Sequence, residues 1–150
     1  MTEINRKAGV MWYGGLNDGS GLISTESRAL FNEAYSHQTR FGEEPGTNPE
    51  ELVAAAHAAC FSMALAGVLK KKGLTPNSIE TNATCTVVSK GEGFEITHMQ
   101  LHVRGDVPGI DEAGFEHLVM ETDRVCPMSN LLRAGLDIKI ETTLVQAVPD

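Results

Sequence analysis

The sequence predicts an α+β protein in which antiparallel strands surround one long buried helix. The first observation behind this prediction is the order of the elements: strands, a long helix, a hairpin, two shorter helices and a final strand. This order suits antiparallel pairing better than a repeated strand–helix–strand unit. The second is that the chain contains neither a G-x-G-x-x-G motif nor a Walker loop, so no motif supports nucleotide binding.

The N-terminal part predicts two strands joined by a glycine-rich turn. Residues 7–24, KAGVMWYGGLNDGSGLIS, alternate between strand-forming and turn-forming stretches. The Asn17-Asp18-Gly19 sequence in the middle supplies residues that tolerate a positive φ. Residues 40–51, RFGEEPGTNPEE, predict a loop because Pro45 and Gly46 are strong turn residues.

The next segment predicts the long helix. Asn48 is a good N-cap, Pro49 suits the first helical position, and Glu51 has the spacing of a capping box. Lys70–Lys72 suit the negative end of the helix dipole, and Gly73 ends the helix. The middle of this helix is apolar nearly all round, so we expect it to be buried on most sides.

The second half of the chain predicts alternating strands and two short helices, of which the last begins at Pro127 and ends at Gly135. In order these are a strand at 78–90, a hairpin turn at 90–93, a half-exposed strand at 97–105, helices at 109–125 and 127–134, and a strand at 136–145. No repeat or linker interrupts the chain, so one domain covering residues 1–150 is expected.

Charge and composition exclude several classes of partner. The net charge of −8 disfavours nucleic acid and anionic membranes. The apolar run Val53–Leu69 has 17 residues with polar ones among them, which predicts a core helix rather than a membrane span.

The first residues contain no apolar run typical of a signal peptide, so we expect a cytoplasmic location. There the three cysteines are expected to be reduced.

The three cysteines differ in their predicted surroundings. Cys126 directly precedes Pro127, which predicts an N-cap whose thiol pKa is lowered by the helix dipole. Cys60 lies among alanines in the middle of the long helix, where burial raises a thiol pKa. It is an ordinary core cysteine unless a cation is brought to it. Cys85 lies on the apolar face of a strand and is expected to belong to the core.

Three further polar residues are each open to more than one interpretation. His57 precedes Cys60 by three residues, which fits a metal ligand, a general base or a hydrogen-bonded histidine. A zinc site needs three or four ligands at recognisable spacing, and no second cluster is present, so we predict no metal. Arg40 and Glu50 are either surface charges or an arginine that stabilises a thiolate and is held by a carboxylate.

Four stretches of the chain together resemble one known family. NPEELVAAAHAACFSMAL, with TRF upstream and VPGID and CPMSN downstream, resembles the OsmC/Ohr family of osmotically inducible proteins and organic hydroperoxide resistance proteins. The wording of the helix motif is similar to the OsmC branch. The resemblance implies an intertwined homodimer without metal or cofactor. It also implies a thiol peroxidase that reduces organic hydroperoxides and is itself restored by an external thiol.

The resemblance assigns a role to four residues. Cys60 is implied to be the cysteine that attacks the peroxide and becomes a sulfenic acid. Cys126 is implied to resolve it as a Cys60–Cys126 disulfide. Arg40 is implied to stabilise the Cys60 thiolate, with Glu50 orienting it. These roles differ from the prediction based on the helix dipole, which favours Cys126 as the attacking cysteine. Cys85 matches no family motif.

Helix geometry adds a constraint to this site. Glu50 and Cys60 are separated by roughly 15 Å along one helix, on faces that differ by about 80°. We therefore expect Glu50, with Arg40, to reach the thiol of the partner chain. Two other interpretations stay open: a non-enzymatic binding module for small apolar ligands with incidental cysteines, and a structural stress protein whose dimer core uses small helix faces.

Overall fold

The computed structural model describes residues 1–135, and it confirms the predicted α+β class with antiparallel pairing. One sheet has the strand order β1-β2-β3, and the other is the β4-β5 hairpin. The elements are β1 Ala8–Tyr13, β2 Ser20–Thr25, β3 Glu33–Tyr35, α1 His37–Phe41, α2 Pro49–Lys71, β4 Ser78–Lys90, β5 Gly93–Asp106, α3 Glu112–Val125 and α4 Pro127–Ala134. The strand predicted at 136–145 lies outside the described residues.

The start of α2 follows the prediction with one difference. The Asn48 side chain accepts a hydrogen bond from the backbone N–H of Glu51 at 2.8 Å, and Pro49 occupies the first turn. The Glu51 carboxylate accepts a hydrogen bond from the Thr47 hydroxyl at 3.0 Å. Only half of the predicted capping box forms, because Thr47 offers Glu51 a nearer donor than the Asn48 backbone.

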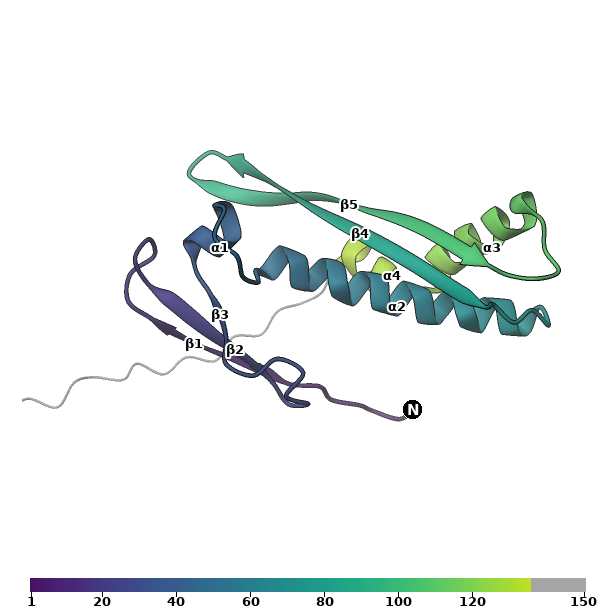
Figure 1. The fold of residues 1–150 in the computed structure, drawn as a ribbon, viewed down its shortest axis with the longest axis horizontal. Coiled ribbons are helices and arrows are strands. Elements are labelled where there is room, and N and C mark those ends of the chain that lie inside the picture. The colour runs from purple at the N-terminus through teal and green to yellow at the C-terminus, as the bar shows by residue number, and fades with distance from the viewer. Residues whose placement is uncertain (136–150) are drawn as a thin grey trace, which may run out of the picture.

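The prediction that α2 is buried on most sides is wrong for the single chain. Its buried residues lie on one side and include Phe61, Leu65 and Leu69. A stripe with four-residue spacing stays exposed, and we call it the uncovered stripe: Ala55, Ala59, Met63 and Gly67. The reason is that β4, α3 and α4 cover the other sides of α2 and no described element covers this one (Figure 1).

The full length of α2 also corrects the judgement that its apolar run is too short to span a membrane. The helix has 23 residues and is long and apolar enough to cross a membrane by those criteria alone. The sequence-based estimate was shorter because it stopped at Leu69 and left out both polar ends. Core helices pass the same test, and α2 packs against α3, α4 and β4.

The β4-β5 hairpin carries one wall of the core. Its strands meet at a two-residue turn between Lys90 and Gly93, where Gly91 takes a φ of 60° that favours glycine. Half-buried and exposed residues alternate as predicted over residues 78–85 of β4 and 98–104 of β5, whereas the ends of both strands next to the turn are exposed. The fully packed centre lies at the C-terminal half of α2. It consists of Leu65, Val68, Leu69 and Leu118, with partly buried neighbours from β4, β5 and α3.

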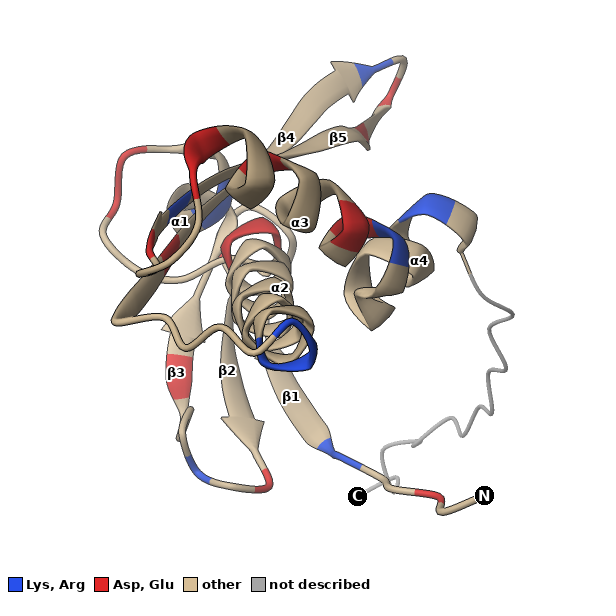
Figure 2. Cartoon of the chain, turned by 90° about the vertical axis from the view of Figure 1, so that its right-hand side faces the viewer, with Lys and Arg blue, Asp and Glu red and all other residues tan. Residues whose placement is uncertain are grey.

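The β1-β2-β3 sheet lies on the opposite side of α2 from the hairpin (Figures 1 and 2). All six residues of β1 are exposed, including Met11, Trp12 and Tyr13. Figure 2 also shows that acidic segments gather around α1 and α3, whereas the near end of α2 is basic.

The sequence did not predict β3 or α1, which are only three and five residues long. Helix α1 begins with a reciprocal hydrogen-bond pair between Ser36 and Thr39. The expectation that residues 40–51 form a loop is therefore wrong at its start. Arg40 belongs to α1, and this helical turn fixes where its side chain begins.

Candidate active site

Two reduced cysteines from distant parts of the chain meet where α4 begins. The Sγ atoms of Cys60 and Cys126 are 3.7 Å apart, and both thiols are free. Cys60 comes from the middle of α2, and Cys126 is the N-cap residue of α4, directly before Pro127 as predicted. A disulfide needs about 2.05 Å between its sulfur atoms, so these two atoms are in contact but not bonded.

The start of α4 stabilises a negative charge on Cys126. This residue is fully buried, and burial alone raises a thiol pKa. The backbone N–H and the hydroxyl of Ser129 outweigh that effect, together with the Cys60 thiol and the Met128 N–H, so the pKa of Cys126 is lowered. The dipole-based expectation for Cys126 is thus confirmed in direction.

Cys60 has the opposite balance. Burial raises the pKa of the Cys60 thiol, and the hydrogen bond with Cys126 adds to the effect. The backbone N–H of Met128 is the one group that lowers it, and this is too little to reverse the sign. Within the described residues, Cys126 is therefore the more acidic of the two thiols.

Arg40 and Glu50 form a bidentate ion pair between α1 and the first turn of α2. The Arg40 Nε atom lies 3.0 and 3.1 Å from the two carboxylate oxygens of Glu50, and Nη2 lies 2.5 Å from Oε1. This hydrogen bonding lowers the pKa of Glu50, which is itself buried, and raises the pKa of Arg40.

The ion pair and the thiol pair are separate in one chain. Among residues 1–135, Cys60 makes no hydrogen bond with Arg40 or Glu50. The pKa of Cys85 is raised by burial and then by the charge of Glu50. Neither Arg40 nor Glu50 is among the described groups that shift the pKa of Cys60, and the contact across two chains stays a prediction.

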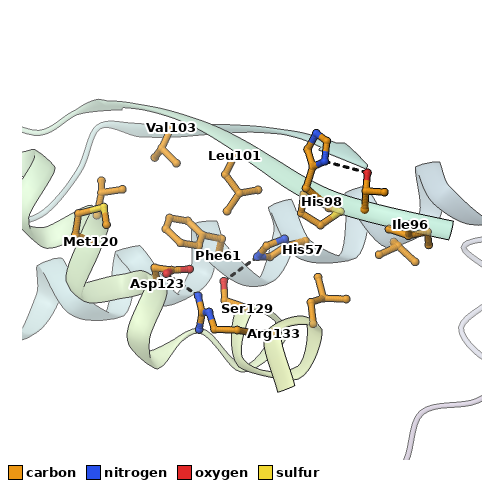
Figure 3. Close-up of a pocket in the computed structure, with 15 residues that line it drawn as sticks. His57, Phe61, Ile96, His98, Leu101, Val103, Met120, Asp123, Ser129 and Arg133 are labelled. Atoms are coloured by element: carbon orange, nitrogen blue, oxygen red, sulfur yellow. Dashed lines mark hydrogen bonds and ion pairs between the residues drawn. The ribbon is translucent and has the colours of Figure 1, made fainter. Parts of the chain in front are cut away.

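His57 and Ser129 are functional candidates that the sequence did not join. His57 Nε2 lies 2.8 Å from the Ser129 hydroxyl, and both side chains are buried (Figure 3). Burial lowers the pKa of His57, while the charge of Asp123 raises it and that of Arg133 lowers it. The sequence did contain a signal for this pair. His57 precedes Cys60 by three residues and Ser129 follows Cys126 by three, so each lies one helical turn from a cysteine. A contact between the two cysteines therefore also brings His57 close to Ser129.

A cavity of about 580 Å³ opens beside His57 and Ser129. Figure 3 shows it between α2, β5, α3 and α4, with Phe61, Leu101 and Met120 among its apolar walls. Neither Cys60 nor Cys126 lines it. Among residues 1–135 no group of three or more His, Cys, Asp or Glu side chains could hold a metal ion.

These features define the class of the protein. An α+β fold that brings two reduced cysteines to one helix start, with N–H donors around one sulfur, provides a thiol-based redox centre. Residues 42–141 match the family described as OsmC-like protein, and the chain belongs to this family.

Relatives and solved structures agree with this assignment. The chain is 43% identical over 135 residues to Peroxiredoxin OsmC of Escherichia coli strain K12, covering 90% of this chain and 94% of that protein. It is 34% identical over 123 residues to the organic hydroperoxide resistance protein OhrB of Bacillus subtilis, covering 81% and 88%. The fold matches a crystal structure from Legionella pneumophila, described as an organic hydroperoxide resistance protein OsmC. That match has a TM-score of 0.69 and 28% identity, over 93% of this chain and 96% of that one.

Proposed function

We propose that this chain is a thiol-dependent peroxidase that reduces organic hydroperoxides to alcohols. The observation that carries the proposal is the 3.7 Å contact between two reduced thiols, one at a helix start and one in an apolar helix. The names of the relatives, peroxiredoxin and organic hydroperoxide resistance protein, support this reaction.

The reaction proceeds in three steps. The Cys60 thiolate attacks the distal oxygen of the hydroperoxide, the O–O bond breaks, and the alcohol leaves after taking up a proton. Cys60 is then a sulfenic acid. Cys126 attacks the Cys60 sulfur, the S–O bond breaks, and water leaves as the disulfide forms. An external thiol reduces this disulfide and restores both cysteines, a step that suits a cytoplasmic location.

The first step needs a positive group, and residues 1–135 of a single chain bring none to Cys60. Burial raises the pKa of this thiol, so a cation must favour its thiolate. Arg40 of the partner subunit supplies that charge in our proposal, and Glu50 of the partner subunit orients it. The separation of the two pairs within one chain supports this arrangement.

Two exposed surfaces support a homodimer whose chains wrap around each other. On α2, the uncovered stripe presents small side chains and Met63, which is 81% exposed. On β1, the side chains of Val10, Met11 and Tyr13 are more than half exposed. Apolar surface of this extent is typical of a protein–protein interface. A twofold axis would bury both surfaces and carry the ion pair of one chain toward the thiols of the other.

The apolar surroundings of Cys60 favour substrates with carbon chains. Burial of each CH₂ group stabilises binding by about 0.8 kcal/mol, which hydrogen peroxide cannot gain. The test is stopped-flow consumption of cumene hydroperoxide and of hydrogen peroxide by wild type, Cys60→Ser and Cys126→Ser. We expect no consumption without Cys60, and a single turnover that ends as a sulfenic acid without Cys126. Equal rates for both oxidants would contradict the apolar preference.

The same variants separate the peroxidase from a binding module for small apolar ligands. A binding module would consume no peroxide in any form and would keep its ligand affinity after Cys60→Ser. Mass spectrometry of unreduced peptides can detect a Cys60–Cys126 disulfide after one equivalent of hydroperoxide. This disulfide is expected for the peroxidase and not for the binding module.

A further inference from the structure

The reaction described above leaves one buried titratable group without a role. His57 is only 6% exposed, and its Nε2 atom pairs with the Ser129 hydroxyl at 2.8 Å. Its Nδ1 atom is buried and has no hydrogen-bond partner among the described residues. A core histidine that served structure alone would be expected to use both ring nitrogens, because an unsatisfied buried polar atom costs about 1–3 kcal/mol.

Ser129 connects this histidine to the reacting sulfur. It lies one helical turn after Cys126 in α4, and its hydroxyl acts on the Cys126 thiol by lowering its pKa. Ser129 therefore stands between the thiol pair and His57: Cys60 contacts Cys126, the Ser129 hydroxyl acts on Cys126, and His57 pairs with Ser129. Figure 3 shows the His57 end of this arrangement beside the cavity.

We propose that Ser129 and His57 form a proton relay that deprotonates Cys126 when it condenses with the Cys60 sulfenic acid. The proposal rests on the proposed peroxidase function and concerns its second step. In this proposal Ser129 exchanges the proton with the reacting sulfur, whereas His57 is a positioning residue that acts through Ser129.

The relay balances the second step. The Cys126 S–H proton passes to the Ser129 oxygen while the Ser129 O–H proton passes to His57 Nε2. The sulfur lone pair of Cys126 then forms the S–S bond as the S–O bond of the sulfenic acid breaks. The departing hydroxide becomes water by taking a proton, which the imidazolium returns through Ser129. No oxidant or reductant beyond the sulfenic acid is required.

The charges around His57 suit a base that is neutral at neutral pH. Asp123 on α3 and Arg133 on α4 form an ion pair at 2.7 Å, so their effects on the imidazole largely oppose each other. His98 on β5 lines the same cavity and is hydrogen-bonded to Thr97. Burial is the largest influence and lowers the pKa of His57, which leaves Nε2 free to accept a proton above that pKa.

The experiment measures disulfide formation separately from peroxide reduction. The wild-type dimer and His57→Gln react with one equivalent of cumene hydroperoxide, and dimedone traps the Cys60 sulfenic acid at timed intervals. Glutamine keeps a hydrogen bond to Ser129 but does not titrate. We expect unchanged Cys60 oxidation and disulfide formation slowed by about tenfold or more. The wild-type decrease in rate as the pH falls through the His57 pKa should be lost. His98→Gln, on the same cavity, should behave as wild type.

A second pair of variants distinguishes loss of the relay from a folding defect. Ser129→Ala removes the hydroxyl and should slow disulfide formation as His57→Gln does, whereas Ser129→Thr keeps a hydroxyl and should restore most of the rate. A wild-type rate in Ser129→Ala or His57→Gln overturns the relay. So does a slower rate that keeps the wild-type pH profile, which would show a structural role. Failure of the peroxidase itself is distinct, because no sulfenic acid would then be trapped even in Cys126→Ser.

Discussion

The thiol pair and the ion pair are each well formed, yet their surroundings differ in a way that matters for chemistry. Cys60 and Cys126 meet at the start of α4, and the groups among residues 1–135 that stabilise negative charge there act mainly on Cys126. Arg40 and Glu50 hold each other at the start of α2, where the charge of Glu50 shifts the pKa of Cys85 and of neither reacting cysteine.

The difference indicates that one chain contains two incomplete halves of a site. The thiol half has the sulfur atoms, but no cation from the described part of the chain ionises Cys60. The ion-pair half has an arginine whose geometry is fixed by a buried carboxylate, but it has no substrate-reactive group beside it. Assembly of two chains joins the halves in our proposal, and the following predictions test that joining.

The largest effect is expected from Arg40→Met. Loss of the guanidinium leaves Cys60 protonated at neutral pH, so the rate of reaction with cumene hydroperoxide should fall by about 100-fold or more. Stopped-flow kinetics at several pH values measures this, and the rate should recover as the pH rises through the raised thiol pKa. A wild-type rate at pH 7 would show that another group activates Cys60.

The same variant distinguishes the two possible arrangements when chains are mixed. If the ion pair serves the partner's thiol, a mixed dimer of Arg40→Met and Cys60→Ser chains has one intact site. After complete exchange of equal amounts, about a quarter of the wild-type activity should return. If the ion pair serves its own chain, no mixed dimer has an intact site, and the activity stays at background.

The second largest effect is expected from Met63→Glu in the uncovered stripe. Met63 is exposed in the single chain, so the substitution should cost the fold of each chain little. In a dimer that buries the stripe, it places two carboxylates in an apolar interface. We expect a monomer by analytical ultracentrifugation and a loss of most peroxidase activity. The matched control is Met120→Glu on α3, which is also exposed and should stay dimeric and active.

Much of the fold could be predicted because its signals are local. The α2 start at Asn48 and the hairpin turn depend on residues a few positions apart, and both are found in the structure. Helix α1 and β3 were missed because they are short and carry little hydrophobic periodicity. The exposure of the α2 stripe was missed because an apolar pattern shows that a face is buried, not whether its own chain buries it.

The site was less accessible to sequence reasoning because its contacts are long-range. The thiol properties of Cys126 follow from one local feature, the proline after it. That Cys60 lies beside it, 66 residues away along the chain, was implied by the family resemblance alone. His57 and Ser129 are 72 residues apart, and only their three-residue spacing from Cys60 and Cys126 indicated that they could meet.

A smaller effect is expected from Glu50→Gln on the pH dependence of stability. Arg40 lowers the pKa of Glu50 in the folded protein, so its contribution is present above the unfolded pKa, about 4.3, and is lost as the pH falls through the folded value. We expect the variant to be about 1–3 kcal/mol less stable at pH 7, with the difference shrinking below pH 4. Urea unfolding at fixed protein concentration measures this. The neighbouring Glu51→Gln, which bonds only Thr47, should give no comparable pH-dependent loss.

The smallest effect is expected from Cys85→Ala. Of the three thiols, Cys85 is the one whose pKa is shifted by Glu50 of its own chain. If the ion pair acted within a single subunit, Cys85 is the thiol that it would influence. Burial raises that pKa and no described group lowers it, so Cys85 should stay a thiol during turnover. We expect the variant to keep wild-type kinetics and to show no free thiol after one equivalent of hydroperoxide, where wild type keeps one per chain. A slower peroxide reaction in Cys85→Ala would place the ion pair's chemistry within one chain.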